Sequence, residues 1–393
     1  MQEFVPFFFI LIFGLFFSTI FNRLHLPWVV ALIVAGIAAG ASNLFEVTPT
    51  IEFFSEIGLV FLMFMAGLET RLSCLRETKR EVGILSIVNG LIPFIVALLI
   101  GFYFGYGLQA SILLGIVFIS SSIAVVIPSL EESGLFGTRL GTSAIGTAIV
   151  EDIVSLFLLS LFFQWVNPSA NISLFIFYPL LVLLLVAIKF IIPRLDALFH
   201  RYSAADSYET EPRVVLAMMV GVVIVFELLG LHPIVAGFFL GLVLSDSLRK
   251  DETKKKLHVL SYGLFIPFFF VTVGAQTDLS VLASLGGAWV VILVVVLGSV
   301  LAKFGSGWLG ARLSGFSSLE GSFIGVSTMP QLSTTLAVVF VGQDLGILKP
   351  ELVTAIVVLS IVTTLISPIL IRHIDRKGDF RNAERDQVLS CYN

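Results

Sequence analysis

The sequence predicts an all-α polytopic membrane protein of about thirteen transmembrane helices, and three observations lead to this prediction. The chain is 57% hydrophobic and only 13% charged, whereas a soluble domain carries roughly 25% charged residues. Its apolar residues form repeated runs of about 18 residues or more, the length that crosses a bilayer as a helix. The basic residues gather in every second connection between these runs.

The apolar runs set the boundaries of the predicted spans. The spans are 4–21, 27–43, 51–69, 82–106, 109–130, 139–164, 173–193, 212–230, 232–247, 257–274, 284–311, 317–343 and 350–371. We expect residues 1–376 to form a single transmembrane unit and residues 377–393 to form a short cytoplasmic tail.

The distribution of Lys and Arg gives the orientation. If the N-terminus lies outside, all 23 basic residues except Lys303 and Lys349 fall in cytoplasmic loops or in the C-terminal tail. Cytoplasmic loops carry an excess of Lys and Arg, and a wrong number of spans would scramble the alternation. The asymmetry therefore supports both the span count and a cytoplasmic C-terminus.

The chain also repeats itself. The end of the third span and the end of the tenth span share four residue types at one offset: Gly67, Thr70, Leu72 and Ser73 match Gly274, Thr277, Leu279 and Ser280. A weaker match joins the segments that contain Gly36 and Gly241. The two copies lie seven spans apart, an odd number, so they face opposite sides of the membrane. Inverted repeats are typical of transporters, with the substrate site near the midplane between the copies.

Two adjacent acids, Glu151 and Asp152, lie halfway along the sixth span. A carboxylate at mid-bilayer costs about 2.5–3.5 kcal/mol even on the lenient insertion scale. A buried structural acid is the alternative, but two such acids double the cost without a structural gain. Adjacent helix positions point about 100° apart, so one acid can face a cavity while the other meets a partner helix.

Hydroxyl groups and a proline interrupt two further spans. The fifth span carries Ser120, Ser121, Ser122 and Pro128, and the twelfth carries Ser327, Thr328, Pro330, Gln331, Ser333 and Thr334. Proline removes a helix hydrogen bond and leaves a carbonyl without its donor. Bare backbone is tolerated at this depth only where it lines a cavity or is buried in protein. We expect two broken helices whose oxygens bind a small cation, and a simple proline kink is the alternative at each.

Lys303 is the one basic residue deep inside a predicted span. A lysine nearer a helix end could extend its ammonium group to the interface. Because Lys303 lies about two-thirds along its span, we expect it to pair with an acid, and Glu151 is the candidate partner. Glu227, near the outer end of the eighth span, is more typical of an interfacial residue.

Several classes of site are disfavoured. The two cysteines, Cys74 and Cys391, fall in predicted cytoplasmic segments and indicate no disulfide framework and no metal site. The spacing of Gly305, Gly307 and Gly310 matches a dinucleotide fingerprint, but it lies inside an apolar helix and follows no strand, so helix packing is favoured. The predicted spans contain no nucleophile paired with a base, so an enzyme is disfavoured. We also expect no cofactor.

These motifs resemble the monovalent cation:proton antiporter superfamily. The segments that carry the resemblance are Gly58–Glu69, Ser120–Ser122, the acidic sixth span, Gly237–Gly241 and Pro267–Gly274. They are most similar to the second branch of the superfamily, which includes bacterial sodium/proton antiporters and the Kef potassium efflux systems. The resemblance covers essentially the whole chain, with the motifs in order, and the nucleotide-binding domain of Kef proteins is missing.

The resemblance implies interleaved core and dimerisation domains, two crossed broken helices, elevator-like alternating access and a homodimer in the inner membrane of a bacterium. The essential ion-binding aspartate of the family maps onto Asp152. The preceding position is Asp in typical electrogenic members, Asn in electroneutral ones and Gln in Kef proteins, so Glu151 departs from all three. Lys303 matches a lysine of electrogenic members, which favours electrogenic exchange, and Glu151 leaves the stoichiometry open.

The functional prediction is therefore antiport of protons against Na+ or K+, with both ions competing for Asp152. The deprotonated site would bind the cation together with Ser121, Ser122 and the oxygens of the twelfth span. Either loaded form is nearly neutral and can cross, whereas moving a bare carboxylate is costly. The alternatives on the same fold are a cation channel, or a sensor or receptor without coupled exchange. Nucleic-acid partners are not expected.

Overall fold

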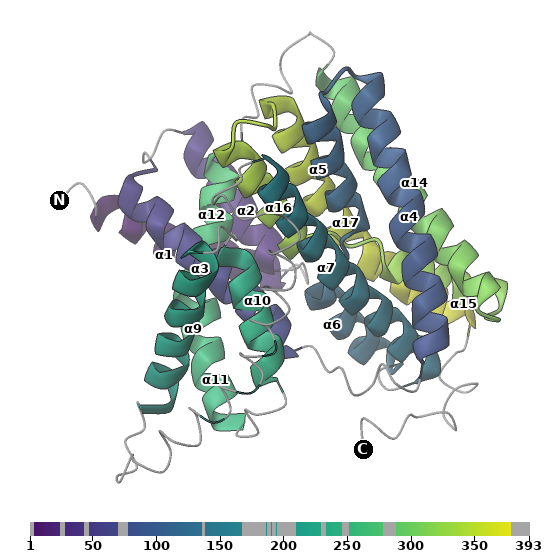
Figure 1. Cartoon of the computed structure of the whole chain (residues 1–393), viewed down its shortest axis with the longest axis horizontal. Coiled ribbons are helices and arrows are strands. Elements are labelled where there is room, and N and C mark those ends of the chain that lie inside the picture. Colours follow the sequence, from purple (N-terminus) through teal and green to yellow (C-terminus); the bar gives the residue numbers. More distant parts are fainter. Residues whose placement is uncertain are drawn as a thin grey trace. The chain divides into compact units, whose positions relative to one another are not determined.

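The computed structural model describes residues 4–23, 28–42, 47–69, 78–135, 138–166, 210–228, 233–245, 251–277 and 288–378, with three isolated positions between 186 and 194. Every regular element in these ranges is a helix (Figure 1). The all-helical prediction is confirmed. The predicted span 173–193 lies outside the described residues except for isolated positions.

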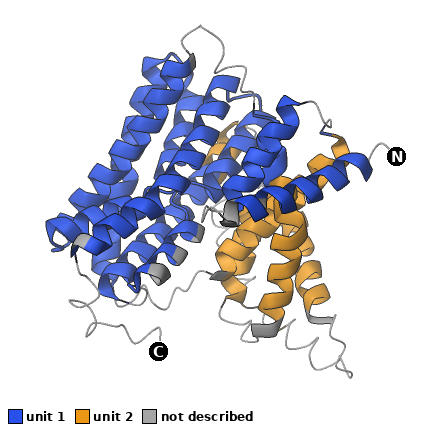
Figure 2. Cartoon of the chain, turned by 180° about the vertical axis from the view of Figure 1, so that it is seen from behind, with its two compact units in different colours: residues 1–47, 72–159, 270–393 blue, residues 48–71, 160–269 orange. Residues whose placement is uncertain are grey.

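The chain forms two compact units, each assembled from segments far apart in the sequence (Figure 2). Unit 1 comprises residues 1–47, 72–159 and 270–393, and unit 2 comprises residues 48–71 and 160–269. That residues 1–376 act together as one antiporter unit stays a prediction. The final helix continues to Gly378, two residues past the predicted boundary, and residues 379–393 lie outside the described ranges.

The helices of unit 1 are α1 (Phe4–Arg23), α2 (Trp28–Ala41), α4 (Lys79–Tyr103), α5 (Leu108–Ile119), α6 (Ile123–Ser133), most of α7 (Arg139–Val166), the second half of α12 (Ile266–Ala275), α14 (Ala288–Leu313), α15 (Ser318–Ser327), α16 (Ser333–Asp344) and α17 (Pro350–Gly378). Those of unit 2 are α3 (Pro49–Glu69), α9 (Thr210–Leu228), α10 (Pro233–Leu244), α11 (Asp251–Leu260) and the π-helical turn η2 (Ser261–Phe265). Six described helices are long and apolar enough to cross a membrane.

Helix α4 illustrates how such a span is oriented. Ile87, Leu91, Ile95 and Leu99 recur every four residues and are exposed, although all four are apolar. An apolar exposed stripe of this spacing suits contact with lipid tails. The opposite face is buried against α5 and α14, and it carries one polar residue, Asn89. The helix therefore presents Asn89 to the interior of unit 1.

The two predicted broken helices are present. The fifth span divides into α5 and α6 around residues 120–122, and the twelfth divides into α15 and α16 around residues 328–332. The two breaks cross each other and exchange hydrogen bonds. The backbone N–H of Ser122 donates to the carbonyl of Pro330 at 2.6 Å, and the Ser121 hydroxyl oxygen lies 2.7 Å from the carbonyl oxygen of Thr328. Backbone groups that the helices release are thus satisfied by the opposite break, as burial requires.

The role predicted for Pro128 is wrong. Pro128 lies inside α6, while the break of that span falls at the three serines before the helix. Prolines at positions 93 and 368 likewise lie inside the continuous helices α4 and α17. Serine hydroxyls compete with the helix for backbone partners, and here the opposite break supplies those partners. Pro330, by contrast, lies within the second break, as predicted.

Paired glycines support the predicted repeat. In unit 1, a Cβ on Gly36 of α2 would collide with the backbone of α12 around Gly274, and a Cβ on Gly274 would collide with α2 around Gly36. In unit 2, Gly67 of α3 and Gly241 of α10 exclude each other's Cβ in the same way. In all four cases the added Cβ would meet the same two backbone atoms of the partner helix. These are the carbonyl oxygen three residues before the partner glycine and the amide nitrogen one residue after it. Matched sequence positions therefore make matched close helix contacts.

Candidate functional site

The acidic pair lies on α7, a 28-residue helix buried within unit 1 over its central part. The side chains of Glu151 and Asp152 are only 1% and 4% exposed. Adjacent positions on a helix project in different directions. Glu151 meets α4, α14 and the α5–α6 break, whereas Asp152 meets the start of α16. The two acids therefore contact different elements, and that one of them faces a cavity stays a prediction.

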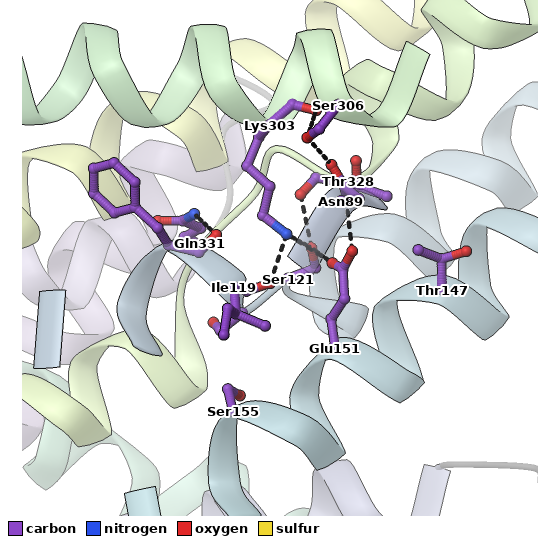
Figure 3. A network of polar contacts seen from close by, with 12 residues as sticks. Asn89, Ile119, Ser121, Thr147, Glu151, Ser155, Lys303, Ser306, Thr328 and Gln331 are labelled. Carbon is purple, nitrogen blue, oxygen red and sulfur yellow. Dashed lines mark hydrogen bonds and ion pairs between the residues drawn. The ribbon is translucent and has the colours of Figure 1, made fainter. Parts of the chain in front are cut away.

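Glu151 is held by three donors (Figure 3). The Lys303 ammonium group lies 2.7 Å from Oε2. The Ser121 hydroxyl lies 2.5 Å from the same oxygen, and the Asn89 amide nitrogen lies 2.6 Å from Oε1. Both carboxylate oxygens are therefore engaged, in a site almost closed to solvent. The predicted ion pair between Glu151 and Lys303 is confirmed.

Lys303 uses all of its donors. Its side chain is 0% exposed, and Nζ lies 2.7 Å from Glu151, 2.6 Å from the carbonyl of Ile119 and 3.0 Å from the Ser121 hydroxyl. An ammonium group has three hydrogens, so three partners match its capacity. Ile119 is the last residue of α5, where the negative end of the helix dipole lies. Lys303 thus neutralises Glu151 and stabilises the end of the broken helix at the same time.

Asp152 has fewer partners. The Thr334 hydroxyl donates to Oδ1 at 3.0 Å, and the carboxylate also faces the backbone amide of Ser121. The hydroxyl of Ser122, the next residue along the break, is buried and has no hydrogen-bond partner among the described residues. A buried carboxylate, a threonine hydroxyl and a free serine hydroxyl therefore lie at the helix crossing. Oxygens of these types are the ligands that hard cations prefer.

The structure sorts the other predicted residues by their partners. Ser120 pairs with Thr335 at 3.0 Å, which leaves its hydroxyl engaged in the crossing. Ser121 is turned toward Glu151 and Lys303, and its predicted role as a cation ligand stays a prediction. Thr328 bonds back to the carbonyl of Ile324 in its own helix at 3.2 Å. These three hydroxyls stabilise the breaks.

Gln331 has its own set of contacts. Its side-chain nitrogen lies 3.1 Å from the Ser299 hydroxyl and 3.4 Å from the carbonyl of Phe118. Its backbone N–H donates to the Thr363 hydroxyl at 3.2 Å, which joins the second break to α17. Ser327 is buried without a hydrogen-bond partner in the part of the chain that the structure describes, and Ser333 is buried.

Two residues of the site escaped the sequence analysis. Asn89 bridges Glu151 and Ser306, whose hydroxyl lies 2.6 Å from Oδ1 of Asn89. The signal was present, because Asn89 is the single side-chain amide of the fourth predicted span, and deep polar residues in membranes are commonly functional. Its partner could not be named without the packing of α4 against α7 and α14.

The structure also shows the surroundings of Glu227 and of the glycines whose spacing matches a dinucleotide fingerprint. Glu227 is exposed on α9, as expected of an interfacial residue. A Cβ on Gly307 would meet Gly325 and Thr328 of the α15 segment, and one on Gly310 would meet Leu85 of α4. These glycines permit close helix packing, as expected for small residues in a membrane span.

Comparison with known proteins extends the geometric result. A family model described as "Sodium/hydrogen exchanger, transmembrane" matches residues 7–375. The Probable Na(+)/H(+) antiporter 3 of Methanocaldococcus jannaschii is 32% identical over 383 residues, which cover 95% of this chain and 97% of that protein. The Na(+)/H(+)-K(+) antiporter GerN of Bacillus cereus is 26% identical over 357 residues, covering 89% of this chain and 90% of its own.

A solved structure shares the fold. The sodium proton antiporter MjNhaP1 from Methanocaldococcus jannaschii superposes with a TM-score of 0.67 and 18% sequence identity, covering 92% of this chain and 94% of that chain. At this identity the likeness concerns the fold alone. The family model and the M. jannaschii relative each extend over nearly the whole chain, so this polytopic membrane protein belongs to the sodium/hydrogen exchanger family.

Proposed function

We propose that the protein exchanges protons for a monovalent cation, Na+ or K+, and that the two ions compete for the Asp152 carboxylate. The observation that carries this proposal is the contrast between the two buried acids. Glu151 is neutralised by Lys303, whereas Asp152 has no ion pair with a basic residue among the described residues, where it receives one side-chain hydrogen bond, from Thr334. Asp152 is therefore the acid that is available to a proton or a cation.

The mechanism follows from the cost of charge in a membrane. A deprotonated Asp152 at the helix crossing would bind a dehydrated cation together with the Thr334 and Ser122 hydroxyls. A protonated Asp152 is neutral and needs no cation. Either loaded form can pass between the two faces, whereas the empty charged site cannot, because a bare carboxylate is costly to move. Binding one ion then lowers affinity for the other by the same factor in both directions.

The names of the relatives agree with this cation class. The M. jannaschii protein is named a Na(+)/H(+) antiporter, and the name of GerN adds K(+). Na+ and K+ are both bound by oxygens, and selectivity between such cations rests on cavity size and ligand number. We also propose that the chain lies in a bacterial plasma membrane, with its N-terminus outside and its C-terminus in the cytoplasm. The alternation of basic residues along the chain supports this orientation.

Asp152→Asn tests the proposal in proteoliposomes. The purified protein is reconstituted with a pH-sensitive dye inside the vesicles, and Na+, K+ and Li+ are added outside in turn. We expect cation-driven proton flux from the native chain and none from Asp152→Asn, because the amide does not release or take up a proton at the pH of the assay and carries no negative charge to balance a cation.

Glu227→Gln is the matched control, since it removes an exposed carboxylate from helix α9. It should exchange at the native rate. Gel filtration in detergent checks that each variant is folded. Native flux in a folded Asp152→Asn variant would overturn the assignment of Asp152.

A further inference from the structure

One peptide unit of the second break, between Pro330 and Gln331, is held at both of its polar ends. Its carbonyl oxygen, on Pro330, accepts the backbone N–H of Ser122 at 2.6 Å. Its N–H, on Gln331, donates to the Thr363 hydroxyl of α17 at 3.2 Å. Gln331 and Thr363 are 0% and 1% exposed. Because a buried peptide group cannot exchange its partners for water, these two hydrogen bonds fix the orientation of the peptide.

The Thr363 hydroxyl can accept this N–H because its own hydrogen is used within α17. The hydroxyl donates to the carbonyl of Leu359 at 2.8 Å, and it lies 3.4 Å from the carbonyl of Ser360. A hydroxyl has one hydrogen and two acceptor lone pairs, so a bond back to its own helix leaves acceptor capacity for Gln331. Thr363 therefore joins the second break to the backbone of α17.

The side chain of Gln331 reaches two more helices. Its amide nitrogen lies 3.1 Å from the Ser299 hydroxyl of α14 and 3.4 Å from the carbonyl of Phe118, near the end of α5. Its amide oxygen is buried and has no hydrogen-bond partner among the residues that the structure describes. Gln331 thus contacts α5 and α14 through its side chain, and it contacts α17 through its backbone.

The two hydroxyl groups proposed as cation ligands lie beyond the two ends of this peptide. Ser122 is bound to it directly, through its own backbone N–H. Thr334 follows Gln331 by three residues, in the first turn of α16, and its hydroxyl donates to Asp152 at 3.0 Å. A rotation of the peptide would therefore displace both hydroxyls from the Asp152 carboxylate.

The two halves of the repeat anchor their breaks with different groups. Asp152 of α7 faces the backbone amide of Ser121, 31 residues earlier in the first break. Thr363 of α17 accepts the backbone amide of Gln331, 32 residues earlier in the second break. The first anchor is the acid that the proposed exchange uses. The second anchor is uncharged, so it can hold its break without competing with Asp152 for the cation.

We infer that Thr363 is a positioning residue, which holds the Pro330–Gln331 peptide in the orientation that brings both ligand hydroxyls to Asp152. This inference rests on the proposed function and deepens it, because it adds a residue of α17 that sets the geometry of the cation site. Loss of the Thr363 hydroxyl changes the affinity of the site for the cation. A residue that serves only folding would instead change the amount of active protein.

Thr363→Val and Thr364→Val form a matched pair of variants. Both threonines are buried on α17, but the Thr364 hydroxyl has no hydrogen-bond partner within the described part of the chain. Thr363→Val keeps the side-chain shape and leaves the buried Gln331 N–H without an acceptor, so the KM for Na+ should rise by roughly five- to tenfold. Thr364→Val should keep the native KM, and so should Thr363→Ser, which retains the hydroxyl. Initial proton flux against Na+ concentration in proteoliposomes measures these values.

A double-variant cycle tests whether Thr363 acts through Thr334. Fewer active molecules lower the maximal flux and leave the KM unchanged. If Thr363 positions Thr334, adding Thr363→Val to Thr334→Val raises the KM by a smaller factor than the same change does in the native chain. Equal factors in the two backgrounds would overturn the inference, because they would show that the two residues act independently.

Binding is also measured without exchange, from the dependence of the melting temperature in detergent on Na+ concentration. Thr363→Val should need more Na+ than the native chain for the same rise in melting temperature. Native KM and native Na+ dependence in a folded Thr363→Val variant would refute the positioning role and leave exchange standing. If that variant does not fold, Thr363→Cys decides, since its thiol is a weaker acceptor. A native chain that binds Na+ but shows no cation-driven flux would count against the proposed exchange alone.

Discussion

Glu151 and Asp152 are neighbours on one helix, yet their surroundings in the fold have little in common. Glu151 has a full counter-charge, a hydroxyl donor and an amide donor, all at 2.5–2.7 Å. Asp152 has one hydroxyl donor at 3.0 Å and the amide of Ser121. Both carboxylates are buried to nearly the same extent, so burial by itself does not distinguish them.

The difference lies in which elements face each acid. Glu151 faces α4 and α14, whose side chains are already paired with it, and its network ties three helices and a break together. Asp152 faces the crossing of the two broken helices, where the Ser122 hydroxyl has no hydrogen-bond partner among the residues that the structure describes. The first arrangement stabilises the fold around a fixed charge pair. The second leaves binding capacity for an ion that arrives and departs.

The largest expected effect is on stability, from removing one half of the locked pair. Lys303→Leu leaves Glu151 buried without its counter-charge and should lower the free energy of unfolding by about 3–5 kcal/mol. Reversible unfolding in mixed micelles measures the change. Asp152→Asn, which disturbs no ion pair, should change it by less than about 1 kcal/mol.

The double variant Lys303→Leu with Glu151→Leu sharpens this prediction. Replacing a buried ion pair with apolar residues is often neutral or stabilising, so the double variant should recover most of the lost stability. If Lys303→Leu and Asp152→Asn were destabilised equally, the two acids would not differ in the way that their partners indicate.

A medium effect is expected on cation affinity at Asp152. Thr334→Val keeps the shape of the side chain and removes the hydroxyl that donates to Asp152. Loss of this hydroxyl as a cation ligand should raise the KM for Na+ by roughly tenfold, since each 1.4 kcal/mol of binding is a factor of ten.

Thr335→Val serves as the control for this change. Thr335 is the next residue, and its hydroxyl pairs with Ser120 instead of with the acid. The KM for Na+ should remain native in Thr335→Val, as measured by initial proton flux against cation concentration. Equal KM values in the two threonine variants would remove Thr334 from the proposed site.

The smallest change in the KM for Na+ is expected from removing the Ser122 hydroxyl. Ser122→Ala deletes a buried group that makes no hydrogen bond within the described structure, so stability should be unchanged or slightly improved. If Ser122 binds the cation, the KM for Na+ should rise by about two- to fivefold, which corresponds to roughly 0.5–1 kcal/mol. A native KM in this variant would leave the binding set with Asp152 and Thr334.

Much of the fold could be predicted from the sequence, because a bilayer leaves few choices for an apolar chain. Runs of apolar residues must form helices whose backbone groups are satisfied internally, and this gave the order of the spans. The two breaks were expected in the correct spans, at the serine cluster and Pro128 in the first, and only the serine cluster lies at that break. Pro128 lies inside α6 and the chain breaks at the serines, because the hydrogen-bond partners of that break come from a segment about 200 residues away.

In the candidate site, too, some features could be predicted from the sequence and others depend on the packing. Composition and position alone identified Glu151, Asp152 and Lys303, because a charge in mid-membrane is expensive and rarely accidental. Which acid meets the lysine, which hydroxyls are already engaged and which one is left free depend on how α4, α7, α14 and the two breaks pack. Asn89 and Ser306 belong to the site only through that packing. The sequence thus specifies which charges the membrane must accommodate, and the tertiary structure decides which of them is neutralised and which remains open to an ion.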